Sequence, residues 1–105
     1  MDSSEISFWT PQSGKEQSGE RPAVVISPKA YNTKVGLALF CPITSKIKNY
    51  PFEVVLDKSL KTKGVVLSDH VKNLDWQMRN VRFQEKLPRK NLQEILEKLQ
   101  LLLFG

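Results

Sequence analysis

Apolar residues in the first four-fifths of the chain occur in short runs, each bounded by proline, glycine or charged residues. Short runs rich in β-branched and aromatic residues between such breakers are typical of β-strands. This pattern predicts strands over residues 6–10, 23–27, 36–41, 52–57, 64–67 and 76–83.

The C-terminal part of the chain changes period. From Leu92 onward the apolar residues fall at positions 92, 95, 96, 99, 102 and 103, which is the spacing of one helix face. Pro88 suits the first turn of this helix, and Gly105 lies just past its end. The pattern predicts a mainly β domain spanning residues 1–105, as a small antiparallel barrel or curved sheet, with one C-terminal helix whose apolar stripe joins the core.

Composition and charge narrow the class of protein. A chain of 105 residues is long enough for one modest core, and its 16 lysines and arginines outnumber its 11 acidic residues. A net charge of +5 favours a polyanionic partner. The single cysteine, Cys41, cannot form an internal disulfide, and the sequence has neither a membrane-length apolar run nor a recognisable signal peptide. We therefore expect a cytoplasmic protein with no membrane partner.

Strand pairing places Arg21 near the end of a second strand. If strands 23–27 and 36–41 are antiparallel neighbours, their connection centres near Asn32, and paired residue numbers should add to about 64. Arg21 would then lie opposite residue 43, give or take two positions. Pro22 further restricts the backbone of Arg21 to extended conformations.

The residues expected around Arg21 suit a phosphate group. Arginine offers a planar fork of donors, and Thr44 and Ser45 add neutral donors. Lys46 and Lys48 add positive charge. The alternative is a solvated arginine, or a surface ion pair with one of two nearby glutamates, Glu16 or Glu20.

Other chemistries find less support in the sequence. The lone histidine, His70, excludes a two-histidine acid–base pair, and the sequence has neither metal-ligand spacing nor a glycine-rich phosphate loop. Ser68, Asp69 and His70 are contiguous, unlike the separate members of a catalytic triad. Trp9 is interpreted either as a core residue or as a base-stacking platform beside the basic loop, whereas Trp76 is expected in the core.

Three segments carry a resemblance to a known family. Residues 11–28 (PQSGKEQSGERPAVVISP), 41–56 (CPITSKIKNYPFEVVL) and 64–76 (GVVLSDHVKNLDW) resemble the MazF/PemK family of toxin endoribonucleases from bacterial toxin–antitoxin modules. The resemblance implies an SH3-like β-barrel with a C-terminal helix, and a homodimer. It also implies cutting of single-stranded RNA by 2′-hydroxyl transesterification without a metal or other cofactor, and neutralisation by a MazE-like antitoxin.

The resemblance also implies roles for individual residues. Arg21 and Thr44 match the catalytic arginine and threonine of the family. The other matching positions are implied to bind RNA: Glu16 and Gln17 in a loop over the RNA, Asp69 and His70 at the bases, and Trp9 near an aromatic position. Together with Ser45, Lys46 and Lys48, these residues form the predicted site. Family members usually open with a longer first strand that carries a Gly-Asp, which is absent here.

Two alternative functions remain open at this point. One is a gyrase poison of the CcdB type, which shares the barrel but is not a nuclease. The other is a non-catalytic SH3-like module that binds RNA or a peptide without cutting it. An RNA cleavage assay separates all three.

Overall fold

The computed structural model describes residues 1–10 and 20–105. The helices are α1 (Lys29–Val35), the 3₁₀ helix η1 (Trp76–Arg79) and α2 (Arg89–Phe104). The strands are β1 (Glu5–Trp9), β2 (Arg21–Val25), β3 (Ala38–Thr44), β4 (Glu53–Val55), β5 (Val65–Leu67), β6 (Lys72–Leu74) and β7 (Arg82–Lys86).

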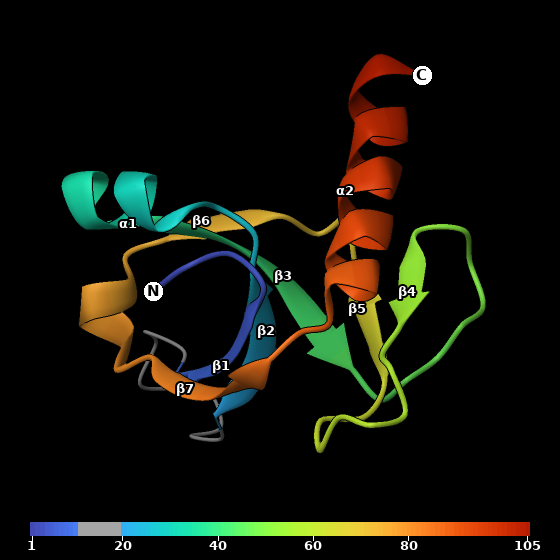
Figure 1. Ribbon diagram of the computed structural model, residues 1–105, viewed down its shortest axis with the longest axis horizontal. Coiled ribbons are helices and arrows are strands. Elements are labelled where there is room, and N and C mark those ends of the chain that lie inside the picture. Colours follow the sequence, from blue (N-terminus) through green and yellow to red (C-terminus); the bar gives the residue numbers. More distant parts are fainter. Residues whose placement is uncertain (11–19) are drawn as a thin grey trace.

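The strands form one antiparallel sheet in the order β4-β5-β3-β2-β1-β7, and β6 pairs with the first half of β3. The sheet wraps around itself, with α2 against one side and α1 at one end (Figure 1). Within the described residues β4 and β7 are its two edges, so the sheet is barrel-like but not closed. The predicted fold, mainly β with a C-terminal helix, is confirmed.

The predicted pairing of the second and third strands is confirmed with a shift of one residue. Ala23 pairs with Pro42 and Val25 with Phe40, so the paired numbers add to 65 instead of 64. The shift arises because the connection is not a simple turn: it contains α1, which ends at Gly36 in a left-handed conformation with φ of 80°. Extending this register outward places Arg21 opposite Thr44.

The prediction of one strand over residues 76–83 is wrong. The carboxylate of Asp75 accepts hydrogen bonds from the backbone N–H groups of Gln77 and Met78, and this cap starts the 3₁₀ helix η1. Asn80, with φ of 49°, ends that helix, and β7 begins only at Arg82. Helix α1 and strand β6 were also not predicted.

The two faces of the sheet build two apolar clusters. Alternation along β2 sends Val24 into the cluster that α2 covers, while Ala23 and Val25 enter the cluster that contains Trp9 and Phe40. Trp9 is only 8% exposed, so its interpretation as a core residue is confirmed. Trp76 packs partly buried against the same cluster.

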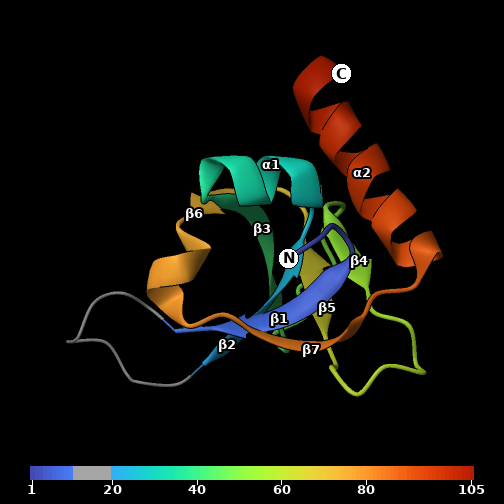
Figure 2. The same cartoon turned by 60° about the vertical axis from the view of Figure 1, so that its left-hand side comes forward.

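Helix α2 contacts the core only as far as Leu99. Ile95 is fully buried and Leu92 and Leu99 pack against the core, as predicted. The remainder of the predicted stripe is wrong, because Leu96, Leu102 and Leu103 are 45%, 48% and 70% exposed. Leu102 and Leu103 are exposed because α2 continues past the sheet, so its C-terminal turns have nothing beneath them in the single chain (Figure 1, Figure 2). Leu96 follows buried Ile95 in the same turn and lies on the exposed side of the helix.

The N-terminal segment is attached to α1 despite lacking the usual longer first strand. The side-chain amide of buried Asn32 donates to the carbonyl oxygens of Met1 and Ser27. These bonds hold the start of the chain beside α1, and β1 pairs with both β2 and β7. Strand β1 is therefore paired along both of its sides.

Two further features bear on the sequence predictions. Cys41 is fully buried in β3, and burial raises the pKa of its thiol to about 12. Among the helices in residues 1–10 and 20–105, none combines the length and apolar character needed to cross a membrane.

Candidate active site

A cleft of about 540 Å³ opens where β2 begins and β3 ends. Arg21 is the first residue of β2 and Thr44 is the last of β3, so the antiparallel pairing brings both residues to the same end of these two central strands. The described lining is Trp9, Arg21, Pro22, Pro42, Ile43, Thr44, Ser45, Lys63, Leu67, His70 and Lys72.

The hydroxyl of Thr44 is oriented by its own turn. Its oxygen accepts a hydrogen bond of 3.1 Å from the backbone N–H of Lys46. Because this bond uses a lone pair, the hydroxyl hydrogen can still be donated to a ligand. Pairing of Thr44 with Val65 on β5 fixes the backbone beneath it.

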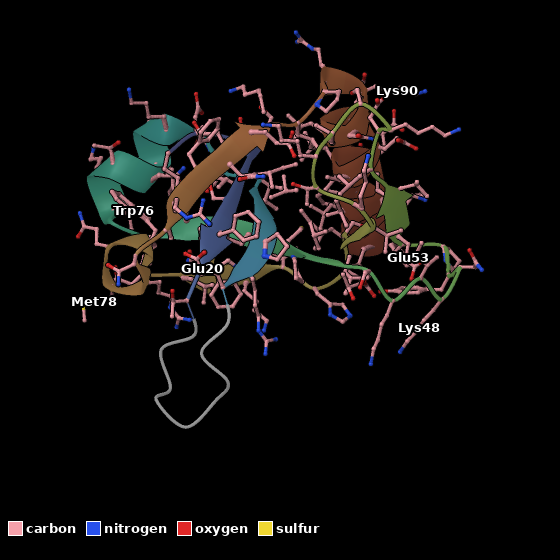
Figure 3. The ribbon with its side chains drawn as sticks, turned by 90° about the horizontal axis from the view of Figure 1, so that it is seen from below. Glu20, Lys48, Glu53, Trp76, Met78 and Lys90 are labelled. Carbon is pink, nitrogen blue, oxygen red and sulfur yellow. The ribbon has the colours of Figure 1, made fainter. Side chains whose placement is uncertain are left out.

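Arg21 is exposed at the opposite side of the cleft. Glu20, one of its two expected ion-pair partners, instead bonds to Arg82 at 2.7 Å, and this hydrogen bond lowers the pKa of the Glu20 carboxyl (Figure 3). The other expected partner, Glu16, lies outside the described residues, as does Gln17. Within the described residues, the guanidinium of Arg21 forms no ion pair.

The charged residues that line the larger cleft are arginine and lysine. Lys63 and Lys72 add to the charge of Arg21, and the described lining includes no carboxylate. Sequence reasoning missed both lysines, although Lys63 directly precedes a predicted strand. Pairing that strand with the end of strand 36–41 would have brought Lys63 to the predicted phosphate site.

A second cleft of about 330 Å³ adjoins the first and shares Thr44, Leu67 and His70 with it. Its other lining residues are Lys46, Lys48, Tyr50 and Asp69. The Tyr50 hydroxyl donates to Asp69 Oδ1 at 2.7 Å, and burial together with this bond raises the pKa of Tyr50 to about 12. Sequence reasoning missed Tyr50, because no local pattern links it to a residue 19 positions away.

The turn that carries Lys46 and Lys48 is fixed by one carboxylate. Glu53 accepts hydrogen bonds of 2.9 Å from the backbone N–H groups of Lys48 and Asn49. The Lys48 side chain extends away from the body of the molecule beside Glu53 (Figure 3). The backbone at Lys46 and Lys48 is therefore held in place along the rim of the smaller cleft.

Trp9 belongs both to the apolar core and to the lining of the larger cleft. Its ring is packed in the core, with the Arg79 guanidinium carbon 5.6 Å from the ring centroid, yet it also lines the larger cleft. Its indole Nε1 is buried without a hydrogen-bond partner in the described part of the chain. The two interpretations of Trp9 are therefore compatible in position.

The predicted site residues are brought together with two exceptions. Trp9, Arg21, Thr44, Ser45 and His70 line the larger cleft, and Lys46, Lys48 and Asp69 line the smaller one. The exceptions are Glu16 and Gln17, which are not described. In residues 1–10 and 20–105, no group of three or more histidine, cysteine or acidic side chains is placed to hold a metal ion.

Comparison with known proteins identifies the family. Residues 6–103 match the family described as PemK-like, MazF-like toxin of type II toxin–antitoxin system. The endoribonuclease toxin MazF of Escherichia coli (strain K12) is 43% identical over 95 residues, covering 90% of this chain and 85% of the relative. The Escherichia coli endoribonuclease PemK is 32% identical over 97 residues, covering 89% and 73%.

Solved structures agree with the sequence relatives. A MazE–MazF structure from Deinococcus radiodurans superposes with a TM-score of 0.90 at 40% identity, covering 99% of this chain and 95% of that chain. MazF alone from the same organism gives a TM-score of 0.88 at 44% identity, covering 100% and 97%. The chain belongs to the PemK/MazF family of toxins from type II toxin–antitoxin systems.

Proposed function

We propose that this protein is an endoribonuclease toxin that cuts single-stranded RNA, with the scissile phosphate bound between Arg21 and Thr44. The observation that carries the proposal is the larger cleft, which these two side chains line together with Lys63 and Lys72. Its described lining includes no carboxylate. Such a lining attracts a polyanion, and no negative side chain in its described part opposes the phosphate groups. The relatives named endoribonuclease support the same activity.

The reaction that fits this lining is transesterification within the RNA. The ribose 2′-oxygen loses its proton and bonds to the adjacent phosphorus, while the bond from phosphorus to the 5′-oxygen breaks and that oxygen gains a proton. The products are a 2′,3′-cyclic phosphate and a 5′-hydroxyl end. The nucleophile belongs to the substrate, so no metal-bound water and no cofactor is needed.

Arg21 and Thr44 act on the charge that develops during this step. Negative charge gathers on the non-bridging oxygens in the transition state, and preorganised donors aimed at that position stabilise it. An arginine keeps its charge at neutral pH, so Arg21 stabilises charge and does not move protons. His70, which lines both clefts, is the described residue best suited to proton transfer.

The smaller cleft suits the bases next to the cut. Asp69 and His70 offer hydrogen-bonding groups to base edges, which are reachable only in an unpaired strand. Ser45, Lys46 and Lys48 hold the backbone along the rim, and Trp9, Glu16 and Gln17 complete the set of proposed RNA-binding residues.

The proposed partners follow from the relatives and from the exposed apolar side chains at the C-terminal end of α2. We propose that two copies form a homodimer, and that a MazE-like antitoxin neutralises the toxin in the cytoplasm. The Deinococcus radiodurans relative was solved together with MazE. A gyrase poison is not favoured, because the curated relatives carry the names MazF and PemK.

The test starts from cleavage of a long natural RNA in the presence of EDTA, with the new 5′ ends mapped. Variants are then compared on an oligonucleotide that contains the mapped site. Arg21→Lys keeps the charge but loses the two-pronged donor, so we expect cleavage to fall ~100- to 1,000-fold, as for loss of a preorganised oxyanion donor. Thr44→Ala should fall into the same range.

Lys48→Ala serves as the comparison, since it should weaken RNA binding and its salt dependence more than the rate of cutting. Near-normal cleavage by a folded Arg21→Lys protein would show that Arg21 is a solvated charge. Loss of cleavage in EDTA with recovery in magnesium would overturn the metal-independent mechanism.

A further inference from the structure

Gly64 lies directly behind the backbone of Thr44. A Cβ atom at position 64 would stand 2.3 Å from the Thr44 carbonyl oxygen and 2.9 Å from its carbonyl carbon. Real Cβ atoms do not approach backbone so closely. The φ of Gly64 is 120°, which side chains of L-residues rarely adopt. Only glycine fits between this strand end and the chain behind it.

The backbone at position 64 cannot retreat from Thr44 without losing other contacts. Its carbonyl oxygen accepts a hydrogen bond of 3.1 Å from the N–H of buried Leu56. The next residue, Val65, is fully buried and pairs with Thr44 itself. A side chain at position 64 would therefore displace Thr44 instead of Gly64.

The segment leading into Gly64 is held from its other side by β7. The carboxylate of Glu85 accepts hydrogen bonds from the backbone N–H groups of Lys61 and Thr62, at 3.1 and 2.8 Å, and from the Thr62 hydroxyl at 2.7 Å. Thr62 is itself buried. Glu85 lines neither cleft, so its role in the site can act only through this segment.

We propose that residues 61–64 form a rigid backstop for Thr44, with Gly64 as the positioning residue in contact and Glu85 as the residue that holds the segment. The backstop fixes where the Thr44 hydroxyl points and keeps Lys63 at the cleft. This inference rests on the proposed function of Thr44 as a donor to the scissile phosphate. It assigns a role in catalysis to a residue without a side chain.

Gly64→Ala tests the proposal, with Gly36→Ala as its matched control. Both glycines have positive φ, so both substitutions strain the backbone, but a Cβ at Gly36 meets nothing within 4 Å. We expect Gly64→Ala to lower the single-turnover cleavage rate about 10- to 100-fold, since a misplacement of ~1 Å can cost that much. Affinity for an oligonucleotide with 2′-deoxyribose at the mapped cut should change less than about threefold, as expected when ground-state binding is retained.

A second readout does not depend on activity. In ¹H–¹⁵N spectra, the amides of Thr44 and Lys46 should shift in Gly64→Ala and stay in place in Gly36→Ala. If both variants cut alike and both leave these amides unmoved, the backstop has no positioning role. If the wild-type protein cuts no RNA but the amides shift only in Gly64→Ala, the proposed function fails while the positional part of the inference stands.

Glu85→Ala decides the matter if Gly64→Ala does not fold. Releasing residues 61–62 from β7 should reduce the cleavage rate with little change in RNA affinity. The control is Asp57→Ala, which removes side-chain hydrogen bonds only to Ser59, at the far end of the same loop. It also removes a negative charge that interacts with Lys63 and Lys90, so RNA affinity is measured for both variants. Equal cleavage by folded Glu85→Ala and Asp57→Ala proteins would overturn the proposal.

Discussion

The strand ends at the larger cleft and the C-terminal turns of α2 differ in how well the single chain supports them. The strand ends are held by contacts within the chain, whereas the helix turns are not. At the cleft, Thr44 is fixed by its pairing with Val65 and by its bond from Lys46. On α2, Leu101, Leu103 and Phe104 are 61%, 70% and 82% exposed. One region is polar and held in place, and the other is apolar and exposed. The C-terminal turns of α2 extend beyond the sheet (Figure 2).

This difference separates a region that the folding of one chain completes from a region that we propose is covered when two copies associate. A large exposed apolar surface on a small protein marks an interaction site. The larger cleft needs no such help for the placement of Arg21 and Thr44, since both stand on paired strands of one sheet. We therefore expect changes on α2 and changes at the cleft to affect different measurements.

The largest expected effect on stability concerns the buried face of α2. Ile95→Ala removes a fully buried side chain and should lower the free energy of unfolding by about 2–5 kcal/mol. Leu96→Ala, one position along and 45% exposed, should change it by no more than about 0.5 kcal/mol. Urea denaturation of both variants measures the contrast, and similar values would mean that the two helix faces are equally covered.

A smaller effect is expected on association. Leu103→Glu places a charge on the exposed apolar end of α2, and we expect it to weaken self-association by about tenfold or more, equivalent to about 1.4 kcal/mol. Met78→Glu is the control, because Met78 is similarly exposed, at 65%, but lies on η1. Light scattering across a dilution series checks both, and a wild-type monomer at micromolar concentration would contradict the proposed homodimer.

The smallest effect concerns pH and the segment behind the cleft. Burial alone would raise the pKa of Glu85, but hydrogen bonds from Thr62 and Lys61 lower it below its ordinary value of 4.5. A lowered pKa stabilises the fold above pH 4.5, and this contribution disappears as the pH falls through the folded-state value. Glu85→Gln should therefore cost about 1 kcal/mol at neutral pH and progressively less in acid.

Unfolding of the wild type and of Glu85→Gln should be compared at pH 7 and at pH 3, since other lowered carboxyls titrate equally in both proteins. A difference that is the same at the two pH values would show that the ionised carboxylate is not what holds residues 61 and 62.

The sequence predicted the strands that build the cleft because their evidence is local. A β-branched run between Pro22 and Pro28 identified β2, and an apolar run ended by Pro42 identified β3. Symmetry about Asn32 then gave the register to within one residue. That register sufficed to bring Arg21 to Thr44. The resemblance to a toxin family agreed with the family match over residues 6–103.

The missed features depend on contacts between distant segments. Tyr50 joins the site through Asp69, and Gly64 is required by the backbone of Thr44, neither of which follows from spacing. The helical period of α2 correctly predicted an apolar stripe, but period alone does not say where the sheet beneath it ends. The structure gives the positions of the other predicted site residues but not of Glu16 and Gln17, and the roles of all of them stay predictions.

Because Cys41 is buried in β3, its reaction with an alkylating reagent can be used to measure how often β3 separates from the neighbouring strands. With its thiol fully covered and its pKa raised to about 12, Cys41 offers almost no thiolate to an alkylating reagent while the strand is paired. Modification must wait until β3 separates from its neighbours, three residues from Thr44. In native buffer the labelling rate of this single cysteine therefore measures how often β3 separates from the strands beside it, without a denaturant or an introduced probe.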